Sequence, residues 1–173
     1  MNLPNKLTLL RIFLIPIFLL IFLISIPYGQ YIATAIFIIA ASTDGLDGYI
    51  ARKRKQITNL GKLMDPLADK LLITAALIVL VESGDISGWI AFIIIGREFF
   101  VTGLRTIAAA EGVIIAASKL GKLKTISQIV AITVTLLNFT FGIYLMYIAV
   151  IFTLWSGIDY YLNARKKIRL KVE

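Results

Sequence analysis

The sequence predicts an all-α integral membrane protein with six transmembrane helices and a short interfacial segment at its N-terminus. Three observations support this fold class. Hydrophobic residues make up 59% of the 173 residues, the mean hydropathy is +0.89, and the apolar residues fall into six runs separated by short polar breaks. A helix needs ~20 mostly apolar residues to cross the hydrocarbon core of a bilayer. Backbone groups in lipid must also be hydrogen-bonded within the segment, which favours helices.

Each predicted span is bounded by polar or turn-forming residues. The spans are Leu9–Pro27, Tyr31–Ile50, Leu63–Val81, Gly88–Ala108, Ile126–Thr140 and Gly142–Leu162. A Pro-Tyr-Gly-Gln turn ends the first, a basic stretch precedes the third, an acidic turn precedes the fourth and a second basic stretch precedes the fifth. Only Asn138 and Gly142 mark the break between the last two.

The N-terminal residues are expected to stay attached to the first span. Lys6 and Arg11 flank its start, but no small-residue cleavage site follows it, which favours a retained span over a signal peptide. Leu3, Leu7 and Leu10 share a helical face that predicts contact with the membrane interface. No internal repeat or long linker divides the chain, so we expect a single domain covering residues 1–173.

Basic residues lie on one side of the threaded chain. With the N-terminus in the cytosol, residues 52–62, residues 111–124 and the tail from 165 are cytoplasmic, and the segments between spans on the opposite side contain no Lys or Arg. This asymmetry predicts that both termini are cytoplasmic. It also accounts for the net charge of +8, which would otherwise suggest a nucleic-acid binder.

Four aspartates lie at the cytoplasmic ends of the second and third spans. Residues three or four apart share a helical face, so Asp44 and Asp47 form one pair, and Asp65 and Asp69 form another. An unpaired aspartate near the bilayer centre costs ~2.5 to 3.5 kcal/mol, and divalent cations would cancel the repulsion between the four. Because the chain has no His and no Cys, the ligands would be oxygens, which favours Mg²⁺ or Mn²⁺.

Simpler explanations exist for some of these aspartates. Asp-Gly pairs are common turn formers, and Asp65 before Pro66 has the pattern of a helix N-cap followed by proline at the first helical position. Either explanation accounts for one or two of the aspartates. Neither accounts for four at this spacing.

The aspartates belong to a longer motif, D-x-x-D-G-x-x-A-R-x8-G-x-x-x-D-x-x-x-D. Its fixed positions are met by Asp44, Asp47, Gly48, Ala51, Arg52, Gly61, Asp65 and Asp69. In this motif the chain resembles the CDP-alcohol phosphotransferases. The resemblance implies that family's six-helix membrane fold, usually homodimeric, with two metal ions holding the pyrophosphate of a CDP-linked substrate.

The resemblance also assigns roles by position. Asp44, Asp47 and Asp65 would be metal ligands, and Asp69 would contact the second ion and act as general base. The reaction requires that negative charge on the diphosphate is neutralised and that a proton is removed from the attacking hydroxyl. These two requirements agree with the assignment of metal ligands and a general base. Residues Gly48, Ala51, Arg52 and Gly61 would line the nucleotide.

A second polar cluster lies in the fourth span and the loop after it. Arg97 and Glu98 lie about halfway along the apolar run, where ionisable residues are rare and usually functional. Guanidinium groups bind phosphate in a bidentate way and lysines add point charges. We therefore predict a phosphate site for the acceptor made by Arg97, Arg105, Lys122 and Lys124. The simpler interpretation is that Arg97 and Glu98 compensate each other beside an ordinary positive-inside loop.

This stretch and the N-terminal L-P-N-K-L-T-L-L-R resemble a branch of the family that forms phosphatidylglycerol phosphate. By analogy, Asn5 and Thr8 would help to hold the nucleotide. The resemblance implies a bacterial inner or plasma membrane enzyme with a cytoplasmic active site. Its substrates would be CDP-diacylglycerol and sn-glycerol 3-phosphate.

Other functions remain open at this stage. The same chemistry could use inositol phosphate as acceptor, or phosphatidylglycerol in a transfer that gives cardiolipin. A divalent-cation transporter is an alternative of another class, since intramembrane carboxylates can bind an ion for alternating access. The clustering of the aspartates at one membrane face and the lack of an inverted repeat in the sequence argue against it.

Overall fold

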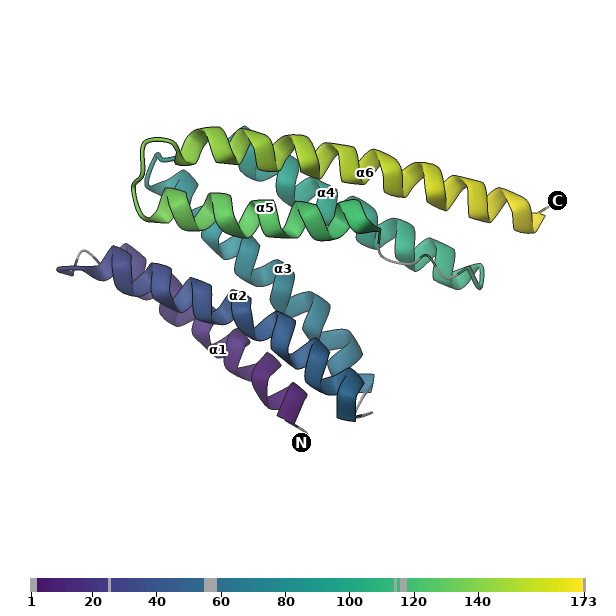
Figure 1. Ribbon diagram of the computed structural model, residues 1–173, viewed down its shortest axis with the longest axis horizontal. Helices are drawn as coiled ribbons and strands as arrows, with labels where there is room; N and C mark the ends of the chain where they lie inside the picture. The colour runs from purple at the N-terminus through teal and green to yellow at the C-terminus, as the bar shows by residue number, and fades with distance from the viewer. Residues whose placement is uncertain (1–2, 25, 55–58, 114, 116–117, 173) are drawn as a thin grey trace.

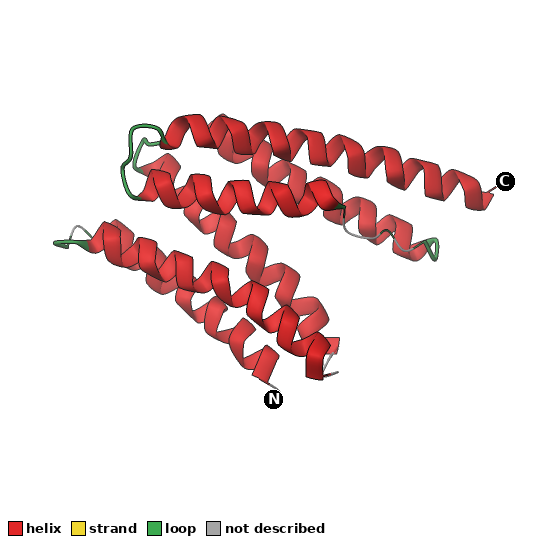
Figure 2. Ribbon diagram, in the orientation of Figure 1, coloured by secondary structure: helices red, strands yellow, loops and turns green. Residues whose placement is uncertain are grey.

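The computed structural model describes residues 3–24, 26–54, 59–113, 115 and 118–172, and it describes the backbone alone at 3–4, 44–54, 59–60, 62–63, 119 and 168–172. Over these residues the chain forms six helices and no strand (Figures 1 and 2). The helices are α1 Leu3–Leu23, α2 Gly29–Arg54, α3 Asn59–Glu82, α4 Gly88–Ala110, α5 Lys119–Leu136 and α6 Gly142–Val172. Each predicted span lies on a different helix, so the all-α prediction is confirmed.

Most helices extend beyond the apolar run that predicted them. The interfacial segment continues into α1 without a break, and α6 runs on to Val172. The third helix begins at Asn59, so Asp65 lies inside it and the N-cap interpretation of Asp65 and Pro66 is wrong. The apolar run marks only the part of each helix that is suited to lipid. Charged residues such as Lys and Arg also have high helix propensity, so the helix continues through them beyond the apolar run.

Two of the helices in the described part of the chain are long and apolar enough to cross a membrane. They are the segments Asn5–Leu23 of α1 and Gly142–Lys167 of α6, and Gly29–Thr43 of α2 is a shorter apolar stretch. Large apolar side chains are nevertheless exposed on other helices too, such as Phe92 on α4, which is 66% exposed. An extensive apolar exterior suits a lipid surrounding. The crossing of the membrane by all six helices stays a prediction.

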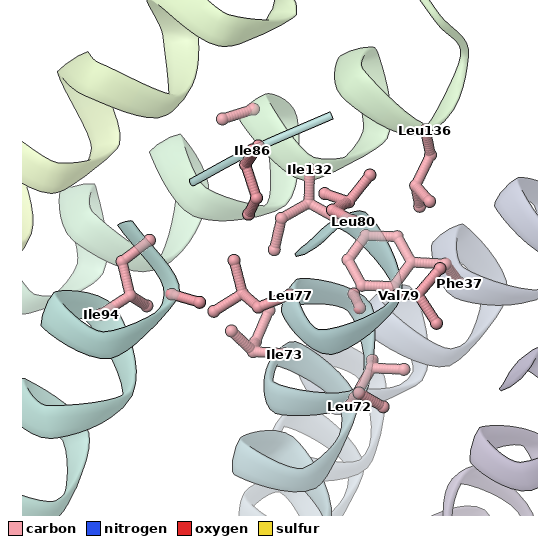
Figure 3. Close-up of a cluster of buried hydrophobic side chains, with 14 of the residues drawn as sticks. Phe37, Leu72, Ile73, Leu77, Val79, Leu80, Ile86, Ile94, Ile132 and Leu136 are labelled. Carbon is pink, nitrogen blue, oxygen red and sulfur yellow. The ribbon is translucent and has the colours of Figure 1, made fainter. Parts of the chain in front are cut away.

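The helices form two groups that α3 joins. Helices α1, α2 and α3 pack together, α4 and α5 each contact α3, and α6 packs on both α4 and α5. In Figure 1, α3 runs between the α1–α2 pair and the α5–α6 pair. This central position explains why α3 supplies much of the buried core. Figure 3 shows that core, with Phe37, Leu72, Ile73, Leu77, Val79, Leu80, Ile86, Ile94, Ile132 and Leu136.

Successive helices run in opposite directions (Figure 1). One end of the molecule, called the aspartate end below, therefore gathers the first residues of α1, α3 and α5 and the last residues of α2, α4 and α6. At the opposite end, the Gln30 side chain joins the two groups of helices. Its amide nitrogen donates to the Leu136 carbonyl, and its oxygen accepts from Asn138 Nδ2 at 3.0 Å.

Candidate active site

The N-terminal helix carries a polar face that is turned toward α2 and α3. Asn5, Thr8 and Arg11 follow one another at three-residue spacing, and all are buried, with Thr8 1% and Arg11 0% exposed. The Thr8 hydroxyl donates to Asp65 Oδ1 at 2.5 Å, across the contact between α1 and α3. This bond fixes the orientation of one predicted metal ligand.

Arg11 connects the same face of α1 to the aspartate-bearing end of α2. Its Nε donates to Thr43 Oγ1 at 3.4 Å, and Thr43 donates in turn to the Ala40 carbonyl at 2.6 Å. Thr43 directly precedes Asp44 in the sequence. A positive charge inside the protein is therefore placed where the first aspartate pair begins, in a setting where buried charges need nearby compensation.

The other residues of the motif lie on the same helices. Gly61 is buried on α3, and Asp65 and Asp69 are half-buried one turn apart on that helix. The motif residues of α2 lie in its last turns, but their side chains are outside the described part of the structure. They are Asp44, Asp47, Gly48, Ala51 and Arg52.

The described donors fit a hard divalent cation. Two carboxylates share one face of α3, and the oxygen-only donor chemistry suits Mg²⁺ or Mn²⁺. No group of three or more metal-ligating side chains occurs among those that the structure describes, a set that includes neither Asp44 nor Asp47. The four-carboxylate site stays a prediction.

A second polar cluster joins the other three helices. Glu98 Oε1 on α4 accepts from Lys124 Nζ on α5 at 2.6 Å and from Arg97 Nη1 at 3.2 Å. Arg97 Nη2 donates to Ser156 Oγ on α6 at 2.6 Å. Lys124 is only 6% exposed, so it lies within the protein and not at its surface. We call these four residues the cationic cluster.

Arg97 is fitted closely against α6. A Cβ atom at Gly157 would lie 3.3 Å from Arg97 Cγ, so the glycine gives the arginine room to pass. Arg97 Nε is buried and has no hydrogen-bond partner among the described residues. This nitrogen lies against α6, 3.9 Å from the position that a Cβ atom of Gly157 would take.

The structure brings together only some of the predicted acceptor residues. Arg97 and Lys124 meet through Glu98, as described above. Arg105 Nε donates to Tyr160 OH at 2.7 Å, and Tyr160 lies one turn from Ser156 on α6. Lys122 is exposed, and because it is two residues from Lys124 on the same helix it points to a different side.

The two polar clusters approach each other at Asp69. Lys124 lies within electrostatic range of the Asp69 carboxylate. The helix contacts agree, since α3 packs against both α4 and α5. A residue predicted to bind the acceptor phosphate is therefore close enough to the predicted general base for their charges to interact. The charge of Arg97 is also compensated by Glu98. The contacts therefore fit both the simpler interpretation, in which the two residues neutralise each other, and the prediction of a phosphate site.

Sequence reasoning missed the polar residues of α6. Thr153, Ser156 and Tyr160 are separated by three and four residues within an apolar helix, which places them on one face. All three are buried and contact polar groups on α4 or α5. This spacing is the signal that could have identified them.

A groove of about 500 Å³ lies between α4 and α6 on the apolar exterior. Its lining is apolar except for Arg97. A phosphate-bearing acceptor requires several polar contacts, which this groove lacks. Its lining suits the apolar chains of a bilayer instead.

Comparisons with known proteins agree with the motif. Residues 1–155 match the family model described as CDP-alcohol phosphatidyltransferase. The chain is 46% identical to a protein of Bacillus subtilis (strain 168), over 92% of this chain and 93% of that protein. It is 43% identical to a Haemophilus influenzae protein, over 92% and 91% of the two chains, and 37% identical to an Escherichia coli (strain K12) protein, over 95% of each. All three relatives are named CDP-diacylglycerol–glycerol-3-phosphate 3-phosphatidyltransferase.

Proposed function

The chain belongs to the CDP-alcohol phosphatidyltransferase family, and we propose that it forms phosphatidylglycerol phosphate and CMP from CDP-diacylglycerol and sn-glycerol 3-phosphate. The names of relatives that match over most of both chains support these substrates. The structural observation that carries the proposal is the largely buried ion-pair cluster of Arg97, Glu98 and Lys124, which lies on two helices that both pack against α3, the helix of Asp69. A phosphate held at Lys124 would bring the hydroxyl of the same small molecule to the base.

The family and the apolar helices indicate a membrane protein. We further propose that all six helices cross the cell membrane of a bacterium, with the aspartate end and both termini in the cytosol. The one-sided basic residues support this orientation. Assembly as a homodimer is proposed from the family resemblance alone.

The aspartate end would bind the CDP-linked substrate. Asp44, Asp47, Asp65 and Asp69 would hold two Mg²⁺ or Mn²⁺ ions, which when bound supply positive charge for the diphosphate. Thr8 orients the Asp65 carboxylate. The nucleotide would lie near Asn5, Thr8, Gly48, Ala51, Arg52 and Gly61.

The cationic cluster would bind the acceptor phosphate. Arg97 and Lys124 carry two positive charges and Glu98 carries one negative charge, which leaves a net charge of +1 before Arg105 is counted. An anionic acceptor is therefore attracted, whereas an uncharged alcohol is not. Lys122, exposed on α5, would add positive charge outside the cluster.

In the proposed reaction, Asp69 takes the proton from the primary hydroxyl of the acceptor. The hydroxyl oxygen forms a bond to the lipid-side phosphorus, and the bond from that phosphorus to the CMP oxygen breaks. CMP leaves with the electron pair. The cationic cluster contributes by orientation, because a hydroxyl fixed beside both base and phosphorus reacts as an intramolecular group would.

The acceptor can be identified with purified protein and radiolabelled CDP-diacylglycerol. We expect CMP release with sn-glycerol 3-phosphate, and little with inositol phosphate or phosphatidylglycerol. Release with one of the other acceptors alone would contradict the proposal. In liposomes, metal-dependent ion flux without any CMP release would instead support the transporter alternative.

A further inference from the structure

Gln128 is a buried polar residue next to the cationic cluster whose hydrogen bonding is incomplete. It lies on α5 one turn beyond Lys124, on the same face of the helix, and it is 1% exposed. Its Nε2 donates to Thr153 Oγ1 at 2.8 Å. Its Oε1 has no hydrogen-bond partner among the described residues. A buried acceptor without a hydrogen bond is unfavourable. A ligand group that donates a hydrogen bond would therefore satisfy this oxygen.

The hydrogen bonds of Thr153 fix which way the Gln128 amide faces. The Thr153 hydroxyl donates its single proton to the Ala149 carbonyl at 2.6 Å. Thr153 can therefore only accept from Gln128, which requires the amide nitrogen on that side. The amide oxygen is turned away from Thr153 and is held there.

The polarity of the free group identifies the chemistry of its partner. Gln128 Oε1 is an acceptor, so ionised phosphate oxygens cannot satisfy it, whereas a hydroxyl can. Because the cationic Lys124 lies one turn away on the same face of α5, this part of the helix is complementary to a molecule that carries both a phosphate and a hydroxyl.

The spacing agrees with a small acceptor. Residues four apart on a helix are separated by ~6 Å along its axis, so a single three-carbon phosphate is long enough to contact both Lys124 and Gln128. With the phosphate at Lys124 and the primary hydroxyl at Asp69, the remaining polar group of sn-glycerol 3-phosphate is its secondary hydroxyl.

We propose that Gln128 Oε1 accepts a hydrogen bond from the secondary hydroxyl of the acceptor and so determines specificity for a glycerol phosphate, an inference that rests on the function proposed above. Thr153 is a positioning residue that holds the amide. Sites built to hydrogen-bond a substrate hydroxyl reject analogues that lack it, because a buried group is then left unpaired.

The test compares two acceptors that differ only in this hydroxyl. Both sn-glycerol 3-phosphate and 3-hydroxypropyl phosphate have the phosphate and the primary hydroxyl, and the second lacks the secondary one. We expect the wild-type protein to prefer sn-glycerol 3-phosphate by about 10- to 100-fold in kcat/KM. In Gln128→Leu the preference should fall to within about threefold of unity, through loss of activity with sn-glycerol 3-phosphate. Gln128→Met, of similar length, repeats the test if the leucine variant does not fold.

Thr135→Ala is the matched control. Thr135 is buried two turns further along the same face of α5, and its hydroxyl donates only to its own helix, at Ala131. This variant should keep the wild-type preference. A wild-type protein that does not discriminate, or a Gln128 variant that still does, would overturn the role of Gln128 alone. If the wild-type protein releases no CMP with sn-glycerol 3-phosphate, the function and the inference both fail.

Discussion

The two polar clusters are built in different ways. On the N-terminal helices, Thr8 contacts Asp65 and Arg11 contacts Thr43, and most of the remaining predicted residues belong to one continuous motif. On the C-terminal helices, Glu98, Lys124 and Ser156 come from three separate helices. Glu98 accepts from both Lys124 and Arg97, and Arg97 donates in turn to Ser156. We therefore expect the transfer chemistry to depend on residues of one motif, and the selection of the acceptor to depend on residues that are far apart in the sequence.

The difference predicts separate kinetic effects. Changes in the N-terminal cluster should alter catalysis or the dependence on the CDP-lipid. Changes in the cationic cluster should alter the dependence on the acceptor. Lys124 and Asp69 lie within electrostatic range of each other. They are therefore the two residues at which the two clusters meet.

The largest effect is expected for Asp69→Asn. Removal of a general base costs about 10²- to 10⁴-fold in rate, so turnover should be lost. Nucleotide and metal binding should be partly retained, as measured by titration calorimetry. Asp44→Asn should instead weaken both kinds of binding. Near-normal turnover by purified Asp69→Asn would rule out its role as base.

An intermediate effect is expected for Lys124→Ala. Loss of one charged hydrogen bond to the acceptor phosphate corresponds to about 10- to 100-fold, so the KM for sn-glycerol 3-phosphate should rise by this factor. The KM for CDP-diacylglycerol should change little. Arg105→Ala should act in the same direction but more weakly, because Arg105 is exposed.

The matched control for this pair is Lys166→Ala, which removes an exposed lysine near the end of α6. It should leave both KM values unchanged. An equal rise in the two KM values of Lys124→Ala would break the proposed separation between the clusters.

The smallest effect is expected for Thr8→Val. A single hydrogen bond to the Asp65 carboxylate is lost, with a net contribution of about 1 kcal/mol, or roughly fivefold. The loss should be seen in the metal and CDP-lipid dependence and not in the acceptor KM. Thr8→Ser, which keeps the hydroxyl, should restore wild-type values. If serine does not restore them, packing and not the hydrogen bond explains the effect.

The sequence predicted the helices well because each carries an apolar run. It predicted their ends less well, since α3 begins at Asn59 and α6 continues to Val172 through charged residues that favour helix. Asn5 and Thr8 are buried on α1, and their contact with the nucleotide stays a prediction. The side chains of Asp44 and Asp47 lie outside the described part of the structure, so the four-carboxylate site stays a prediction.

The C-terminal cluster was only partly predictable. Arg97 and Lys124 could be recognised because charges are rare in apolar helices, but their meeting through Glu98 depends on how α4 and α5 pack. Ser156 is an ordinary small polar residue in the sequence, and only its distance to Arg97 shows its role. The unsatisfied oxygen of Gln128 is likewise visible only in three dimensions.

The step that most needs a test is attack by the primary hydroxyl oxygen of the acceptor on the lipid-side phosphorus of CDP-diacylglycerol. It can be tested with sn-glycerol 3-phosphate that carries ¹⁸O in that hydroxyl, followed by mass spectrometry of the lipid product and of CMP. We expect all of the label in phosphatidylglycerol phosphate and none in CMP. Label in CMP, or CMP release without a labelled lipid product, would contradict it.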